Sequence, residues 1–305
     1  TKHVFHLLPS GCKRNPTAKL LLGPGTVINV DKLLEEITNY RVVDEFANRL
    51  VIDENAIIIS DADIKLEQEV KKTIGSTGQG VGAATATNII ARLYGTDKHK
   101  AKNVDKLKPY IGSTYDILEN LYQNNKRILL EGTQGTGLSI HHGIYPYVTS
   151  RDTSVSGCLS EAGISPKRVN KIIMVTRSYP IRVGGTSGPF FSKEIDMETI
   201  AKRSGKDVNE LKRNEKTTTT KVDRRIAEFS WTMFRKACEL NSPSDIALTF
   251  TDYFSRENEK ARRDDQLTPE TRQFIEEIET CSGVKVSLIS TCFDYRAIID
   301  RRNWK

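Results

Sequence analysis

Short apolar runs alternate with longer amphipathic segments along most of the chain, and this alternation predicts its architecture. The short runs are bounded by glycine, proline or polar residues, which favours buried strands over helices. We predict strands at residues 4–8, 20–22, 56–59, 128–130, 171–176, 246–248 and 284–289. Apolar residues at helical spacing predict helices at residues 31–50, 105–124, 225–240 and 269–281. Strands that alternate with helices indicate an α/β fold with a mainly parallel central sheet and flanking helices.

Local signals add detail to this pattern. Asp31 is a candidate N-cap for the helix at 31–50, and Thr268-Pro269-Glu270 has the cap, first-turn proline and early acid of a helix start. A glycine-bounded turn is expected at residues 23–25. The charged segment 256–265 is the best candidate for disorder.

Composition limits the classes of protein. With 305 residues, of which 37% are hydrophobic, the chain can form a real core, as one large domain or as two modest ones. No apolar run approaches the roughly 20 residues that span a bilayer, and the first residues do not resemble a secretory signal. The five cysteines are odd in number and include no CxxC pair, so neither a disulfide framework nor zinc is supported. These features predict a cytoplasmic protein without membrane contact.

The net charge of +7 has two explanations, nucleic acid or small anionic substrates. The basic residues are interleaved with acids, and no aromatic residues are spaced among them as a stacking platform. We therefore favour anionic small molecules over nucleic acid.

The most informative stretch is residues 128–157, ILLEGTQGTGLSIHHGIYPYVTSRDTSVSG. Its predicted strand runs into a loop with three glycines around Gln134, where the backbone can approach a ligand and one amide can donate and accept. Residues 149–154 place small and acidic polar residues around one arginine, which suits phosphate or carboxylate. A glycine-rich turn followed by an ordinary helix cap is the alternative. The adjacent His141 and His142 have no third ligand spaced with them, so we predict no metal there.

Two further segments have ligand-binding chemistry. Residues 74–80, IGSTGQG, form a glycine-rich turn that could surround a phosphate, although the chain has no P-loop match. Residues 214–225, NEKTTTTKVDRR, combine threonine hydroxyls with arginine forks, which suits a ligand with two carboxylates.

Taken together, these sequence motifs resemble those of one protein family. EGTQGT followed by HHGIYPYVTS resembles the EGAQGT…HGTYPYVTS signature of adenylosuccinate synthetase, a ligase that joins aspartate to a purine nucleotide. HLLPSG, IGSTGQGVG, PIRVGG, the threonine-rich segment and a late LIS occur in the family's order and span most of residues 2–300. The resemblance implies the family's fold, which is similar to that of P-loop NTPases, as a single domain spanning residues 1–305.

The resemblance also implies roles for residues that would bind the purine monophosphate. Ser76 and Thr77 match the pair at the 5′-phosphate, and Thr149 matches another phosphate contact. Gln134 matches the residue at the purine base and would help to hold the activated base, which makes it the catalytic candidate. Arg92 lies near an arginine that reaches the partner's nucleotide in a homodimer, with an ordinary surface arginine as the alternative.

Other matches concern the ribose and aspartate. Arg182, Val183 and Gly184 match the segment at the ribose. Aspartate binding is implied for Thr219, Thr220 and Arg224; Val222 stands where the common form has another arginine, and this puts that arginine's substrate contact in doubt.

The implied donor site departs more from the family. Asp252 matches the aspartate that accepts from guanine N1 and N2 of GTP, but Phe250 replaces the lysine that packs on this base. Ser290 lies where the family surrounds the same base, and the family's Gly-Pro is absent. GTP is therefore the expected donor and ATP the alternative.

One insertion leaves a second purine substrate as an alternative. Residues 183–188, VGGTSG, are longer than the common pattern and resemble the family's phage-associated branch, which joins aspartate to guanylate or deoxyguanylate on the way to diaminopurine nucleotides. The expected purine is IMP, and (d)GMP is the alternative.

The family's GDEGKGK loop and GHT histidine supply the general base, the acid, a phosphate lysine and the Mg²⁺ ligands. Neither motif occurs between Thr1 and Lys305. We expect a preceding segment of the natural protein to carry them, because the other substrate-binding segments are present. A truncated, non-catalytic nucleotide-binding protein is the alternative. With that segment, the resemblance implies phosphorylation of the purine 6-oxygen by the donor, followed by attack of the aspartate amine.

Overall fold

The computed structural model describes residues 4–40, 46–217 and 221–302. By its internal contacts the chain divides into two compact units, unit 1 at residues 1–168 and unit 2 at residues 169–305. Each unit is described by itself.

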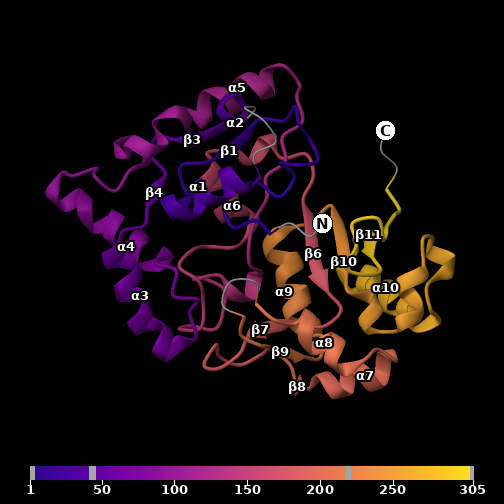
Figure 1. The fold of residues 1–305 in the computed structure, drawn as a ribbon. Coiled ribbons are helices and arrows are strands. Elements are labelled where there is room, and N and C mark those ends of the chain that lie inside the picture. Colours follow the sequence, from indigo (N-terminus) through magenta and orange to yellow (C-terminus); the bar gives the residue numbers. More distant parts are fainter. Residues whose placement is uncertain (1–3, 41–45, 218–220, 303–305) are drawn as a thin grey trace. The chain divides into compact units, whose positions relative to one another are not determined.

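Unit 1 has parallel strands and flanking helices (Figure 1). One sheet has the order β1-β3-β5, formed by β1 (Leu20–Leu22), β3 (Leu50–Asp53) and β5 (Ile111–Gly112). A parallel pair is formed by β2 (Val27–Ile28) and β4 (Ile57–Ile58). The helices are α1 (Val30–Asn39), α2 (Phe46–Arg49), α3 (Asp61–Ile74), α4 (Val81–Ala91), α5 (Thr114–Gln123) and α6 (Val155–Ala162). Leu20, Ile28, Leu33 and Ile52 are buried in one core, so the strands pack against α1.

Several boundaries in unit 1 differ from the sequence prediction. Asn29, not Asp31, caps α1, because its Oδ1 accepts from the Lys32 N–H at 3.1 Å. The helix ends at Asn39 instead of continuing to residue 50. The predicted helix at 105–124 is a 3₁₀ turn (Asp105–Tyr110) followed by α5, because Pro109 interrupts it and Ser113 caps a new start.

Two predicted strands in unit 1 are wrong. Residues 4–8 form no strand, because the Glu36 carboxylate accepts the backbone N–H groups that a neighbouring strand would use, those of His6, Leu7 and Leu8. Residues 128–130 also form no strand, and Leu129 is 88% exposed. No strand of the described residues pairs with this segment, which leaves its apolar side chains uncovered.

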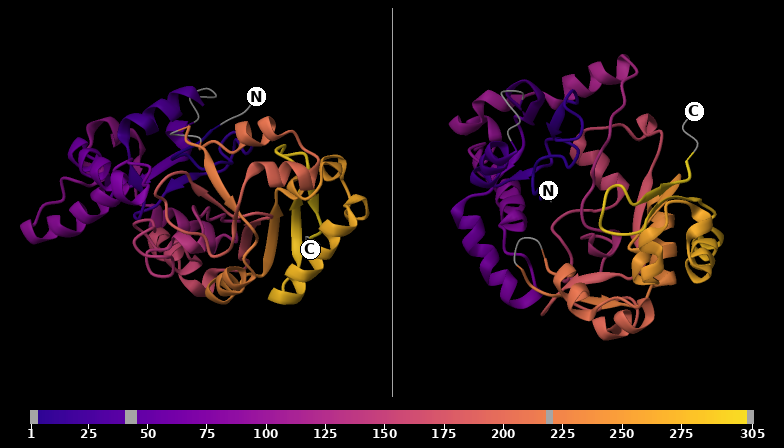
Figure 2. Two further views of the ribbon diagram at one scale, coloured as in Figure 1. Left: turned by 90° about the horizontal axis from the view of Figure 1, so that it is seen from below. Right: turned by 45° about the vertical axis from the view of Figure 1, so that its right-hand side comes forward.

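Unit 2 contains a four-stranded sheet of order β12-β11-β10-β6 (Figure 2). Its strands are β6 (Ile173–Arg177), β10 (Asp245–Thr249), β11 (Val286–Ser290) and the antiparallel β12 (Ile298–Asp300). A second, antiparallel sheet consists of β7 (Ile181–Val183), β9 (Arg224–Ala227) and β8 (Glu194–Ile195). The helices are α7 (Met197–Ser204), α8 (Val208–Asn214), α9 (Trp231–Asn241) and α10 (Pro269–Ser282). Phe234 of α9 and Ile278 of α10 share a core with Ile246 and Ile289 of the parallel strands.

The predicted strands at 171–176, 246–248 and 284–289 are confirmed as β6, β10 and β11, and Thr268-Pro269 begins α10 as expected. The predicted helix at 225–240 begins only at Trp231, because residues 224–227 pair in the antiparallel sheet and Ser230 caps the helix. The predicted parallel α/β class is confirmed, with the antiparallel sheet as an addition.

Segment 256–265 is not the disordered loop that its charge predicted. It forms two 3₁₀ turns (Arg256–Lys260 and Asp264–Gln266) around the buried Asn258. The Asn258 amide donates to the Thr251 carbonyl and the Thr271 hydroxyl, each at 2.8 Å, and its oxygen accepts from the Thr268 N–H at 3.0 Å. A satisfied buried amide fixes the segment in spite of its exposed charges.

No helix among the described residues is long and apolar enough to cross a membrane.

Candidate functional site

The glycine-rich turn at residues 75–80 connects α3 to α4 in unit 1. Gly78 and Gly80 have φ of 66° and 86°, a region that disfavours side chains. A Cβ on Gly80 would lie 2.7 Å from the Ile59 Cγ2, so the backbone passes too close to its neighbour for any other residue. The glycines thus set the direction in which α4 begins.

The two phosphate candidates on this turn differ in their surroundings. The Ser76 hydroxyl donates to Glu67 Oε1 at 2.8 Å, and Glu67 Oε2 accepts the Gly82 N–H at 3.1 Å. Glu67 therefore caps the first turn of α4 and holds Ser76. Thr77 is exposed beside it.

The Gln134 loop and residues 149–154 form one module. Gln134 has φ of 59° and an exposed side chain, whose Oε1 accepts from the Thr133 hydroxyl at 2.9 Å. The Thr149 N–H donates to the Leu138 carbonyl at 2.8 Å, and the Thr153 hydroxyl donates to the Gly135 carbonyl at 2.8 Å. These bonds tie both ends of the loop to the polar segment.

Asp152 organises the polar segment. Its carboxylate accepts from the Ser139 hydroxyl at 2.8 Å and from the Ser154 hydroxyl at 2.6 Å. Burial works to raise the pKa of Asp152, but the hydrogen bonds from Ser154 and Ser139 outweigh it and hold the pKa below the usual value. The arginine of this segment, Arg151, is paired with Glu161 of α6.

The glycine-rich turn and this module meet at Gly82. A Cβ on Gly82 would lie 3.4 Å from the Ser150 Cβ, so the first turn of α4 rests against residues 149–150. The structure therefore brings the Ser76-Thr77 turn next to the segment of Thr149, which is itself bonded to the Gln134 loop. Arg92 is exposed at the other end of α4, roughly 16 Å away at 1.5 Å per residue.

In unit 2 the predicted ribose and aspartate segments lie side by side. Arg182 pairs with Arg225, and Val183 with Arg224, across β7 and β9. The Gly184 N–H donates to the Asp223 carbonyl at 2.9 Å, and a Cβ on Gly184 would lie 2.6 Å from that oxygen. Only glycine allows this approach.

One side-chain donor of Arg182 is hydrogen-bonded to the inserted residues 186–188. Its Nε donates to the Ser187 carbonyl at 2.7 Å. Burial, with a smaller effect of the nearby Arg225, lowers the pKa of Arg182. Arg225 is bound by Glu194 through two hydrogen bonds, and its Nη1 donates to the Gly188 carbonyl at 2.8 Å. The insertion therefore folds back on both arginines.

Arg224 is held by a buried carboxylate. Its Nη1 lies 3.3 Å from Oε2 of Glu215, a residue that also accepts from Arg177 and Tyr253. Thr219 and Thr220 lie outside the described residues, so their predicted aspartate contacts stay predictions.

The two donor-site candidates meet at the carboxyl edge of the parallel strands. Asp252 follows β10, Ser290 ends β11, and the Thr251 hydroxyl donates to the Ser290 carbonyl at 3.1 Å. This edge is where parallel sheets bind ligands.

The Asp252 carboxylate is 5% exposed. Lys206 Nζ donates to Asp252 Oδ2 at 2.7 Å and also to Glu259. Asp252 Oδ1 is buried and has no hydrogen-bond partner among the described residues. Burial raises the pKa of Asp252, and Lys206 offsets part of this.

Four residues of these clusters were missed in the sequence analysis: Glu67, Arg177, Lys206 and Glu215. Arg177 could have been found, because it directly follows the strand predicted at 171–176, at the carboxyl end where parallel strands bind ligands. Glu215 lies within the quoted threonine-rich motif. Glu67 and Lys206 carry no such signal, because the groups they bind are distant in sequence or are backbone.

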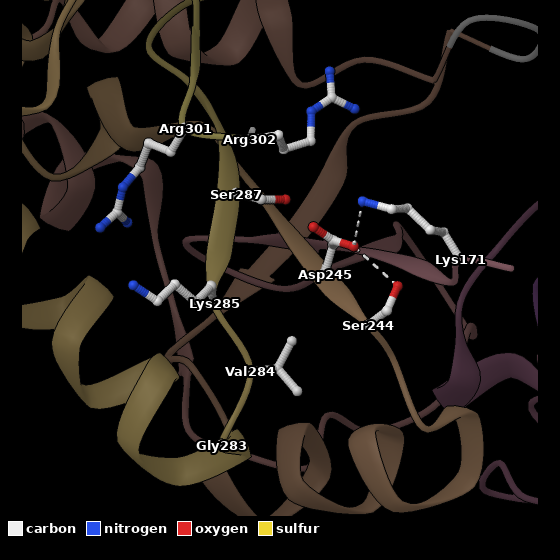
Figure 3. A pocket seen from close by; sticks show the side chains of 9 residues that line it. All are labelled: Lys171, Ser244, Asp245, Gly283, Val284, Lys285, Ser287, Arg301 and Arg302. Atoms are coloured by element: carbon white, nitrogen blue, oxygen red, sulfur yellow. Dashed lines mark hydrogen bonds and ion pairs between the residues drawn. The ribbon is translucent and has the colours of Figure 1, made fainter. Parts of the chain in front are cut away.

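The cavity in Figure 3, with a volume of about 470 Å³, lies at the opposite edge of the unit 2 sheet. The residues that line it come from the amino ends of β6, β10 and β11 and from the segment after β12: Lys171, Ser244, Asp245, Gly283, Val284, Lys285, Ser287, Arg301 and Arg302. None of the predicted site residues is among them. Within the described part of the chain, no three His, Cys, Asp or Glu side chains are grouped to hold a metal.

Comparisons with known proteins agree with the sequence motifs. The family described as "Adenylosuccinate synthetase" matches residues 1–94 and 93–259. An adenylosuccinate synthetase of Methanococcus aeolicus is 37% identical over 99% of this chain and 85% of its own length. One from Pyrococcus horikoshii is 33% identical, with the same two coverages.

Two solved structures share the fold. Fully ligated adenylosuccinate synthetase from Plasmodium falciparum superposes with a TM-score of 0.83 at 24% identity, over 99% of this chain and 89% of that one. Succinoaminodeoxyadenylate synthetase of cyanophage S-2L, bound to dGMP and to dATP as an energy donor, gives 0.76 at 25% identity, over 99% and 82%. By the extent of the family match and by its identity to these relatives, the chain belongs to the adenylosuccinate synthetase family.

Proposed function

We propose that this protein joins L-aspartate to C6 of IMP with hydrolysis of GTP, as a ligase of purine nucleotide biosynthesis. Family membership supports the reaction class. The assignment of residues is supported by the close approach of Gly82, which follows the Thr77 turn, to Ser150, which follows Thr149. Hydroxyls, glycine amides and one amide side chain are thus available together for a nucleoside monophosphate.

In the proposed reaction, a general base removes the N1 proton of the purine, the 6-oxygen attacks the γ-phosphorus of GTP, and GDP leaves. The aspartate amine then attacks C6, the C–N bond forms, and the phosphate departs with the 6-oxygen while the amine loses a proton. Gln134 would hold the base during these steps, and Ser76, Thr77 and Thr149 the 5′-phosphate. Positioning and charge stabilisation carry most of such catalysis.

Unit 2 would supply the remaining contacts. Arg182, Val183 and Gly184 are proposed for the ribose, and Thr219, Thr220 and Arg224 for the two carboxylates of aspartate. Arg224 suits this role because a guanidinium has five N–H groups and Glu215 takes one of its side-chain donors. Asp252 and Ser290 are proposed for the base of the triphosphate.

Magnesium is expected with the triphosphate because it neutralises charge on the transferred phosphoryl group. The described residues contain no group of three metal-binding side chains, and the family motif expected to supply the Mg²⁺ ligands does not occur in residues 1–305. We therefore derive no step through this ion.

A homodimer is proposed from the far end of α4. Arg92 is flanked there by strongly exposed apolar residues, Ile89, Ile90, Leu93 and Tyr94. Contiguous exposed apolar surface marks interaction sites, and a second copy would bury it and bring Arg92 to the partner's nucleotide. Replacing Leu93, which is 75% exposed, with Glu should convert the dimer to monomer in light scattering, whereas Leu129→Glu, at an 88% exposed leucine of another segment, should not. A Leu93→Glu protein that stays dimeric would contradict this interface.

A second candidate, a (d)GMP-aspartate ligase that uses ATP or dATP, is favoured by specific observations. The inserted residues 186–188 accept hydrogen bonds from Arg182, which is proposed for the ribose, and from Arg225. At the donor base, Phe250 takes the place of a lysine, and the Asp252 carboxylate is bonded to Lys206. The similar cyanophage enzyme binds dGMP and dATP.

The test is a matrix of substrates with the natural protein. Aspartate is combined with IMP or dGMP and with GTP, ATP or dATP. Phosphate release and the mass of the nucleotide joined to aspartate are both measured. Product from IMP with GTP supports the first assignment, and product only from dGMP supports the second. Nucleotide binding without phosphate release in any combination would refute both and leave a non-catalytic nucleotide-binding protein.

A further inference from the structure

Glu215 is a buried carboxylate at the start of the threonine-rich segment, with 1% of its side chain exposed. Its Oε1 accepts from Arg177 Nη2 at 2.5 Å and from the Tyr253 hydroxyl at 2.8 Å. Its Oε2 accepts from Arg224 Nη1 at 3.3 Å, and its backbone carbonyl accepts the Arg224 N–H at 2.9 Å. A group buried this deeply and satisfied on both oxygens has a fixed orientation.

The charges around Glu215 are unequal. One carboxylate faces two guanidinium groups, so the cluster carries a net positive charge. Burial works to raise the pKa of Glu215, but Arg177, Tyr253 and Arg224 outweigh it and hold the pKa below its usual value. The short bond to Arg177 and the long bond to Arg224 show which arginine is anchored and which keeps donors for a ligand.

The anchored arginine leads to the donor segment. The Arg177 guanidinium lies over the Phe250 ring, 3.6 Å from its centroid, and its Nε donates to the Tyr179 carbonyl at 3.2 Å. Phe250 and Tyr253 flank Asp252, the residue proposed for the base of the triphosphate. Glu215 is therefore in contact with the donor segment by two routes, directly through Tyr253 and indirectly through Arg177 and Phe250.

We propose that Glu215 is a positioning residue that orients Arg224 for the amino-acid dicarboxylate and couples it to the segment at residues 250–253. The inference rests on the proposed function, because it takes Arg224 as the aspartate contact. It predicts that changes in the donor segment alter the affinity for aspartate through Glu215 and Arg224.

The test compares aspartate KM and kcat of the natural protein and its variants. Glu215→Gln keeps the shape but removes the charge, and we expect aspartate KM to rise on the order of tenfold with kcat changed less. A role in folding alone would lower the active fraction, and hence the apparent kcat, at unchanged KM. Glu198→Gln, the same change on an exposed carboxylate of α7, is the control and should leave both constants unchanged.

Two milder variants keep the proposal testable where Glu215→Gln does not fold. Tyr253→Phe removes one hydrogen bond to Glu215, and Phe250→Leu removes the ring under Arg177; each should raise aspartate KM about threefold. Unchanged aspartate KM in Glu215→Gln, or in Tyr253→Phe when the former is insoluble, overturns the positioning role. Unchanged aspartate KM in Phe250→Leu overturns the coupling. An inactive natural protein would overturn the proposed function and this inference with it, whereas an active one leaves the function standing whatever the variants show.

Discussion

The predicted site residues of unit 1 and unit 2 are held in place by different kinds of interaction. In unit 1, glycines, backbone amides and hydroxyls position the side chains, the carboxylates of Glu67 and Asp152 accept from such neutral groups, and Thr77 and Gln134 are exposed. In unit 2, the site residues are positioned by two buried carboxylates that bind arginine or lysine, Glu215 and Asp252. A neutral hydrogen bond contributes about 0.5–1.5 kcal/mol, whereas breaking a buried ion pair costs about 3–5 kcal/mol. The candidate site residues thus depend on local geometry in unit 1 and on charge compensation in unit 2.

The largest expected effect is at Lys206. Lys206→Met leaves the buried Asp252 and the partly buried Glu259 without their shared cation, and should lower the free energy of unfolding by about 3–5 kcal/mol. Urea denaturation measures this loss. Lys212→Met, which removes an exposed pair with Glu198 on the neighbouring helix, should cost less than about 1 kcal/mol. Equal losses in the two variants would show that charge compensation does not dominate in unit 2.

The next effect tests whether close backbone approach also matters in unit 2. A methyl group at Gly184 would lie 2.6 Å from the Asp223 carbonyl, so Gly184→Ala should separate β7 from β9 and cost about 1–3 kcal/mol. Thermal unfolding gives the comparison with Gly11→Ala, where a Cβ meets nothing within 4 Å. A Gly184→Ala protein as stable as Gly11→Ala would contradict the close approach.

In unit 1 we expect Asp152→Asn to cost about 1–2 kcal/mol, because one acceptor oxygen is lost from the bonds to Ser139 and Ser154. The folded pKa of Asp152 is lowered, so its stabilising contribution is present above the unfolded pKa of about 3.9 and is lost as the pH falls through the folded pKa. The difference in stability between the natural protein and the variant should therefore shrink in acid. A difference that stays constant from pH 7 to pH 2.5 would show that the charge of Asp152 is not involved.

The smallest effects separate two adjacent residues of the glycine-rich turn. Ser76→Ala removes the bond to Glu67 and should cost about 1 kcal/mol in stability, whereas Thr77→Ala should change stability by less than about 0.5 kcal/mol. Calorimetric titration with IMP and with dGMP should show the larger loss of affinity in Thr77→Ala. The reverse order would assign the phosphate contact to Ser76 and a structural role to Thr77.

The sequence predicts best those elements whose identity depends on neighbours along the chain. Strands β6, β10 and β11 are continuous apolar runs, and α10 has its own start signal at Thr268-Pro269. The antiparallel strand β9 was missed because the apolar positions of α9 extend its helical pattern backwards over Arg225 and Ile226. Residues 4–8 have the composition of a strand, but Glu36, about 30 residues away, takes their N–H groups.

The site residues show the same difference between local motifs and partners that are distant in sequence. Ser76, Gln134, Thr149 and Arg224 belong to local motifs and could be proposed from the sequence, although their roles stay predictions. The residues that hold the site residues in place could not be proposed from the sequence. Lys206 and Asp252, for example, are separated by 46 positions, and only the folded chain brings them together. The single domain implied by the resemblance and the cytoplasmic location inferred from composition also stay predictions.

The contact at Gly82 restricts how this protein can diverge. Its φ lies outside the left-handed region, so an alanine there would fit, with its methyl group in ordinary contact with the Ser150 Cβ. A valine or leucine at position 82 would need the volume that the serine occupies. Substitutions at positions 82 and 150 should therefore occur as compensating pairs, with a bulkier residue at one accompanied by glycine or alanine at the other.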